Sequence, residues 1–182
     1  MKKTYKLALM AMYAAISVLA VALIRIPLVP AAPFLVYDMA DIPILLATLT
    51  LGGPAGGLVL LVVCLIQAFL MGGEGWVGFV MHFVSPGAMI VIYSLIHRNW
   101  KGLVGSLVAA LLATVAMTLV MIPMNLWLTV VFMGTPRSVV VDMLIPAIIP
   151  FNLIKAGLNS FLTVAVYQLT APIFRKLGAV GK

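Results

Sequence analysis

Long apolar stretches, separated by short breaks rich in glycine and proline, run through almost the whole chain. Of the 182 residues, 65% are hydrophobic and only 8% are charged, and the mean hydropathy is +1.27. Soluble domains contain only about half apolar residues. Repeated apolar runs of this length are typical of helices that cross a bilayer. The sequence therefore predicts an all-α integral membrane protein.

Apolar length and the Gly/Pro breaks divide the chain into six membrane segments within a single domain, residues 1–182. The predicted segments are residues 6–26, 42–52, 54–71, 76–96, 103–132 and 146–173. The second segment rises only about 16 Å as a helix, against a hydrocarbon core of about 30 Å, so it must be tilted, broken or buried in protein. The first run resembles a signal peptide, but no polar cleavage region follows it, and we expect a retained helix.

The charged residues lie at the ends of these segments, and the net charge is +7. With a cytoplasmic N-terminus, most basic residues fall on the cytoplasmic side, as the positive-inside rule requires. These are Lys2, Lys3, Lys6, Arg98, Lys101, Arg175, Lys176 and Lys182. The acidic residues Asp38, Asp41, Glu74 and Asp142 fall in the outward connections. We predict cytoplasmic termini, a multi-pass protein in contact with lipid in a prokaryotic cytoplasmic membrane, and no nucleic-acid partner.

The connection between the first two segments, "RIPLVPAAPFLVYDMADIP", is long and largely apolar, and its prolines make it stiff. Such a connection can cap a cavity. Alternatively, it lies along the membrane surface with Phe34 and Tyr37 in the interface.

Lys155 is the one charged residue left inside a predicted segment. An ionised lysine at membrane depth costs about 2.5–3.5 kcal/mol on insertion scales, so it is expected to face a ligand or cavity, or else to pair with Asp38 or Asp41. Asn152 precedes it by one turn, and Asn125 is expected at similar depth on the neighbouring segment. Each amide offers a donor beside an acceptor, which suits the edge of a uracil-like ring. We therefore predict a polar ligand pocket in the outer half.

Other polar residues favour packing roles. Asn159 and Gln67 are expected to form interhelical hydrogen bonds, as is His82. Ala11 and Ala15 form a small-residue stripe on the first segment, where another helix can approach closely.

Several catalytic signatures are missing from the sequence. It contains no G-x-x-x-x-G-K-[ST] phosphate loop, H-E-x-x-H or G-x-S-x-G, and Cys64 stands alone. An intramembrane enzyme would need a catalytic pair, and the nearest is His82 with Glu74. We predict a protein that is not an enzyme, without catalytic residues, a metal site or a cofactor.

Four stretches resemble the substrate-binding S components of energy-coupling factor (ECF) vitamin transporters, in particular the riboflavin-binding members. They are "AMYAA", "FLVYDMADIPILLATLTLGGPAG", "PMN" and "IPFNLIKAG". The resemblance implies six helices, a vitamin bound near the outer surface under the first loop, and uptake with a transmembrane coupling subunit and two ATPase subunits.

The resemblance also implies residue roles. Asn125, Asn152 and Lys155 match polar residues that contact the flavin, and Asp38 and Asp41 match the acids that close the first loop. Ala11 and Ala15 would face the coupling subunit. Phe34, Tyr37 and Trp127 are candidate partners for an aromatic ring.

Two alternatives remain open at this point. The chain is an S component for another heteroaromatic vitamin or flavin analogue, such as an anionic pteridine that pairs with Lys155. Otherwise it is a membrane subunit that assembles a larger complex without transporting anything, and its polar residues only join helices.

Overall fold

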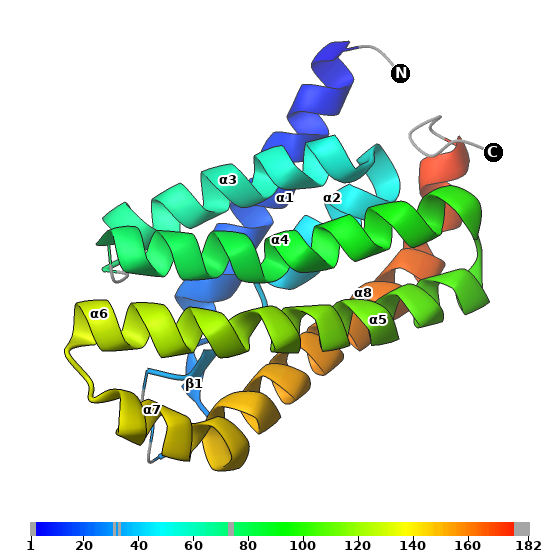
Figure 1. Ribbon diagram of the computed structural model, residues 1–182. Coiled ribbons are helices and arrows are strands. Elements are labelled where there is room, and N and C mark those ends of the chain that lie inside the picture. Colours follow the sequence, from blue (N-terminus) through cyan, green and yellow to red (C-terminus); the bar gives the residue numbers. More distant parts are fainter. Residues whose placement is uncertain (1–2, 31, 33, 73–74, 177–182) are drawn as a thin grey trace.

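The computed structural model describes residues 3–30, 32, 34–72 and 75–176, which fold as a bundle of helices (Figure 1). The elements are α1 (Lys3–Leu23), β1 (Ile26–Pro27), β2 (Val36–Tyr37), α2 (Asp41–Leu51), α3 (Gly53–Leu70), α4 (Gly75–Asn99), α5 (Leu103–Met124), the π-helical η1 (Asn125–Thr129), α6 (Val130–Met133), α7 (Arg137–Met143), the π-helical η2 (Leu144–Ile148) and α8 (Ile149–Lys176). The two short strands pair antiparallel within the α1–α2 connection.

Within the described residues, five helical stretches are long and apolar enough to cross a membrane. They are Lys3–Leu23, Gly53–Leu70, Gly75–Asn99, Leu103–Met133 and Arg137–Ile173. The short apolar helix α2 is the sixth. The predicted all-α membrane bundle is thus confirmed.

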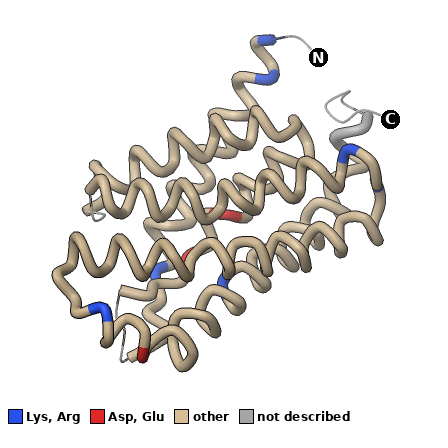
Figure 2. The backbone as a smooth tube through the Cα atoms, in the orientation of Figure 1, with Lys and Arg blue, Asp and Glu red and all other residues tan. Residues whose placement is uncertain are grey.

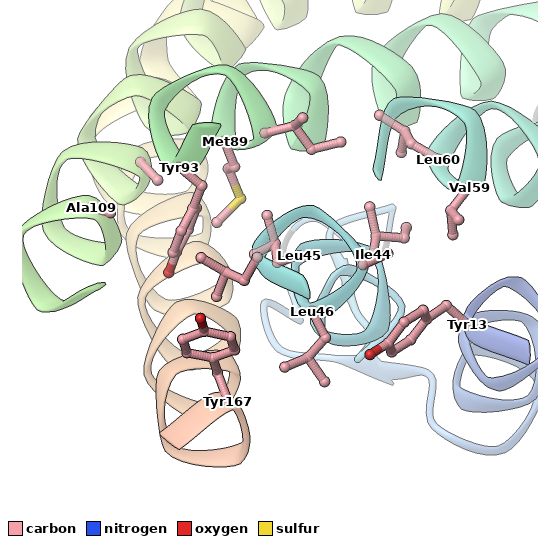
Figure 3. Close-up of a cluster of buried hydrophobic side chains, with 14 of the residues drawn as sticks. Tyr13, Ile44, Leu45, Leu46, Val59, Leu60, Met89, Tyr93, Ala109 and Tyr167 are labelled. Atoms are coloured by element: carbon pink, nitrogen blue, oxygen red, sulfur yellow. The ribbon is translucent and has the colours of Figure 1, made fainter. Parts of the chain in front are cut away.

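Helix α2 lies at the centre of the bundle, which explains how an apolar helix can be so short. It contacts α1, α3, α4 and α8. Ile44 and Leu45 are fully buried, and side chains of α1, α3, α4 and α8 surround them (Figure 3). Of the three arrangements that its length allowed, the helix therefore adopts the one buried in protein, where it need not span the hydrocarbon core.

The two C-terminal segments contain π-helical turns next to prolines. Pro123 precedes η1, and Pro146 lies inside η2. Proline removes a backbone donor from the hydrogen-bond ladder, and a local π turn accommodates that loss without ending the helix. The last helical stretch therefore begins at Arg137 rather than at the predicted residue 146.

Both ends of the described chain lie at the same end of the bundle. The first turn of α1, the α4–α5 junction and the last turns of α8 are close together in this view (Figure 1). Basic positions mark the start of α1 and the end of α4, whereas the acidic positions lie in the middle of the bundle and toward its opposite end, where further basic positions also lie (Figure 2). The cytoplasmic placement of both termini stays a prediction.

The close contact between α2 and α3 depends on Gly56. A Cβ atom there would overlap the Thr48 side chain and lie 3.1 Å from the Thr48 Cα. We expect Gly56→Ala to lower the free energy of unfolding by about 1–3 kcal/mol, because backbone must move to admit the methyl group. Thermal unfolding in one detergent measures this change.

Gly57→Ala is the matched control, because a Cβ atom at this neighbouring position meets no heavy atom within 4 Å. Alanine is the better helix former, so this variant should be as stable as the wild type or slightly more so. Equal losses in the two variants would contradict the close-contact explanation.

Candidate functional site

A cavity of about 280 Å³ lies between the α1–α2 connection and helices α3, α4, α5 and α8. Its polar and charged lining residues are Arg25, Asp38, Gln67, His82, Ser85, Asn125, Thr129, Asn152 and Lys155. Its larger apolar lining residues are Phe34, Met81, Met117, Met121, Met133 and Phe151. A concave space that combines apolar and aromatic walls with convergent polar groups is typical of a small-molecule site, and the volume is close to the lower end of such sites, about 300 Å³.

Asn125 and Asn152 line this cavity from two different helices. Both side chains are fully buried, and each begins or follows a π-helical turn, a feature common at functional sites. The Asn125 Nδ2 donates to the Met121 carbonyl, and the Asn152 Nδ2 donates to the Ile148 carbonyl, both at 2.8 Å. These bonds fix both amides, and they leave the oxygen of Asn152 free to accept a hydrogen bond from a ligand.

Lys155 also lines the cavity and forms an ion pair with Asp38. The Nζ atom lies 2.7 Å from the Asp38 Oδ2, and both side chains are buried. The Asp38 Oδ1 accepts a hydrogen bond from the Ala40 backbone at 3.0 Å. Burial opposes ionisation of Asp38, but the Lys155 ammonium and these hydrogen bonds hold the pKa of this carboxyl below its usual range. The two roles considered for Lys155, facing a cavity and pairing with an acid, are therefore combined.

Asn159 joins the connection and α2 to α8, one turn beyond Lys155. Its Nδ2 donates to the Asp38 carbonyl at 3.1 Å and to the Asp41 Oδ2 at 2.9 Å. Its Oδ1 accepts from the Tyr37 hydroxyl at 3.0 Å. The predicted interhelical role of Asn159 is confirmed.

The α1–α2 connection forms one wall of the cavity. Phe34, Leu35 and Val36 line it. Leu35 and Tyr37 are also buried in a small apolar cluster with Ile148 of η2 and Phe151 in the first turn of α8. Of the two alternatives for this connection, these contacts favour the cap over a free surface segment.

The structure brings most of the predicted site residues together. Phe34, Asp38, Asn125, Asn152 and Lys155 line the cavity. Tyr37 and Asp41 lie behind this lining and support it through Asn159.

The remaining predicted residues lie on the outer surface of the bundle. Trp127 is 62% exposed and is not among the cavity-lining residues, because it lies two positions after Asn125 and therefore points to roughly the opposite side of the helix. Ala11 and Ala15 are exposed on α1.

Sequence reasoning missed several lining residues. His82 and Gln67 line the cavity, although both were expected only to join helices. Arg25 also lines the cavity, and its place at the end of the first predicted segment, beside the capping connection, was the available signal. Glu74, the partner considered for a catalytic pair with His82, lies outside the described residues.

A multi-pass membrane bundle with a polar, partly aromatic cavity under a capping connection is a small-molecule-binding membrane protein. Residues 5–167 match the family described as ECF transporter, substrate-specific component. The chain belongs to this family, whose members are transporter components, and it is a multi-pass protein of the cell membrane.

Similar proteins support this assignment. The riboflavin transporter RibU of Lactococcus lactis subsp. cremoris is 32% identical over 130 residues, which cover 70% of this chain. The match spans 63% of the length of that relative. RibU of Staphylococcus aureus is 27% identical over 158 residues, covering 84% of this chain and 82% of the relative.

A solved structure has the same fold. It is described as the S component of a bacterial ECF transporter and superposes with a TM-score of 0.82 at 27% identity. The superposition covers 94% of this chain and 98% of that one.

The hydrogen bonds of Asn159 predict that a substitution at this position destabilises the folded protein. Asn159→Ala removes the donor to Asp41 and leaves a buried carboxylate without that partner. We expect the free energy of unfolding to fall by about 1–3 kcal/mol, the cost of an unsatisfied buried group. Asn99→Ala is the control, because Asn99 is exposed and its bond to the Leu95 carbonyl is long, 3.4 Å. If both variants unfold at the wild-type temperature, Asn159 does not hold the connection in place.

Proposed function

We propose that this chain is the vitamin-binding subunit of an ECF-type importer and that its ligand is riboflavin. One observation carries this proposal: Asn125, Asn152 and Lys155 all line the same cavity, beneath a capping connection. The similarity to two riboflavin transporters over most of the chain supports the same ligand.

The cavity chemistry suits a flavin ring. The uracil-like edge of the ring alternates acceptors with an N–H donor, which complements the amide oxygen of Asn152 and the ammonium of Lys155. Phe34 and Phe151 offer aromatic contacts, and methionines adapt their shape to a broad apolar ring.

The two alternative functions fit these contacts less well. An anionic pteridine would pair with Lys155, but the Asp38 carboxylate already occupies that position at 2.7 Å. A subunit that only assembles a complex would need its polar residues to join helices. Asn159 does so, whereas Asn152 and Lys155 line the cavity. Another neutral heteroaromatic vitamin remains the second candidate, because a polar ring edge would meet the same groups.

Uptake further requires partners. We propose that the ligand enters from the outer side and leaves inward once a transmembrane coupling subunit, carrying two ATPase subunits, engages α1. The exposed alanines Ala11 and Ala15 let a partner helix approach α1 closely. Riboflavin is then the transported ligand rather than a cofactor.

The ligand proposal predicts a flavin absorption spectrum for the purified protein, with riboflavin released on denaturation and identified by mass spectrometry. Lys155→Ala and Asn152→Leu should each weaken riboflavin binding about 10- to 100-fold, because a buried ligand group loses its partner. Quenching of riboflavin fluorescence on titration with protein measures the affinity.

Lys6→Ala is the control for this titration, since Lys6 lies on the first turns of α1, at the end of the bundle away from the cavity. It should bind riboflavin as the wild type does. Wild-type affinity in both cavity variants would remove Asn152 and Lys155 from the ligand site.

The partner proposal predicts a separation of binding from transport. Replacing Ala11 and Ala15 with tryptophan should leave riboflavin affinity within about twofold, because neither residue lines the cavity. The same change should abolish co-purification with the coupling subunit and uptake by whole cells. Ala165→Trp is the control, as Ala165 is exposed on α8 instead. Intact co-purification of the α1 variant would assign the interface to another face.

A further inference from the structure

The charge of the cavity wall beside Lys155 is set by the α1–α2 connection rather than by the helices. Among the lysines and arginines of residues 3–30, 34–72 and 75–173, Lys155 alone is buried. The Asp38 carboxylate meets its ammonium at 2.7 Å, and both residues line the cavity. A ligand that reaches this wall therefore meets an ion pair and not a lone cation.

Other charged or titratable groups near this wall do not reverse that balance. Asp41 lies behind it and accepts a hydrogen bond from Asn159, so a second acidic side chain is close to Lys155. His82 also lines the cavity, close enough to interact with the charges of Asp38 and Lys155. Arg25 lines it too, but it is exposed, where its charge is solvated. The Tyr37 hydroxyl is held by Asn159.

We propose that Asp38 is a specificity-determining residue, which neutralises Lys155 so that the cavity accepts an uncharged ring edge and disfavours an anionic one. This inference rests on the proposed function, because it concerns the same cavity and a flavin ligand. Because both side chains are buried, the carboxylate repels a negative charge on the ligand more strongly than it would in water, while Lys155 still donates its remaining hydrogens. The lysine thus serves as a hydrogen-bond donor rather than as an anion site.

Riboflavin itself reports on this charge balance. Its ring N–H ionises in alkaline solution with a change in visible absorption, so the pH at which the bound ligand ionises measures the charge that the wall presents. Removing the carboxylate should make the anionic ring easier to form. With Asp38→Asn, at saturating riboflavin, we expect the bound ring to ionise at a pH lower than in the wild type by about one unit.

Three further variants separate charge from structure. Lys155→Gln should shift the ionisation to higher pH, and it also serves as the test if Asp38→Asn does not fold. The double variant, with Asp38→Asn and Lys155→Gln, loses one negative and one positive charge, so the wall keeps the wild-type sum of formal charges. The bound riboflavin ring should then ionise close to the wild-type pH. Asp142→Asn, an exposed acid on α7 away from the cavity, should change nothing. If Asp38 only anchored the connection, its variant would lower affinity without moving the ionisation.

The outcomes also distinguish the two proposals. Riboflavin binding with the same ionisation pH in the wild type, Asp38→Asn and Lys155→Gln would overturn the charge-selection inference and leave the proposed function standing. A wild-type protein that binds no riboflavin would overturn the proposed function, and with it this inference. Opposite shifts in the two single variants would support both.

Discussion

The ion pair between Lys155 and Asp38 is the interaction on which the outer half of this protein depends. A buried charge is tolerated only when it is paired and hydrogen-bonded. Lys155 comes from the last helix and Asp38 from the α1–α2 connection, so the pair holds a non-helical segment against the bundle at 2.7 Å. Asn159 adds hydrogen bonds to the same segment. The connection thereby becomes a fixed wall of the cavity.

The inner architecture follows from a different constraint. Helix α2 is too short to cross a bilayer, and it is buried among α1, α3, α4 and α8. Close packing around it relies on small residues, of which Gly56 against Thr48 is the tightest example. Because α2 directly follows the connection, its position also places Asp38 and Asp41 beside α8. The packing of α2 therefore determines where these two acidic side chains lie relative to the ligand site.

These features fit the proposed binding of a neutral aromatic vitamin from the outer side. The cavity combines adaptable methionine walls with a few fixed polar groups, and the asparagine amides are already fixed by their own helices. Preorganised groups bind a ligand without first paying for their own ordering. The exposed alanines of α1 lie on a separate surface, so the proposed ligand site and the proposed partner interface use different parts of the chain.

The sequence by itself determined the membrane class, the six apolar segments and the outer-half residues Asn125, Asn152 and Lys155, because apolar length and isolated polar residues are local signals. It left three points to the tertiary structure: whether the connection caps a cavity, which acid meets Lys155, and that His82 and Arg25 line the cavity. Each depends on contacts between residues far apart in the chain, such as Asp38 with Lys155. Periodicity along one segment carries no information about such contacts.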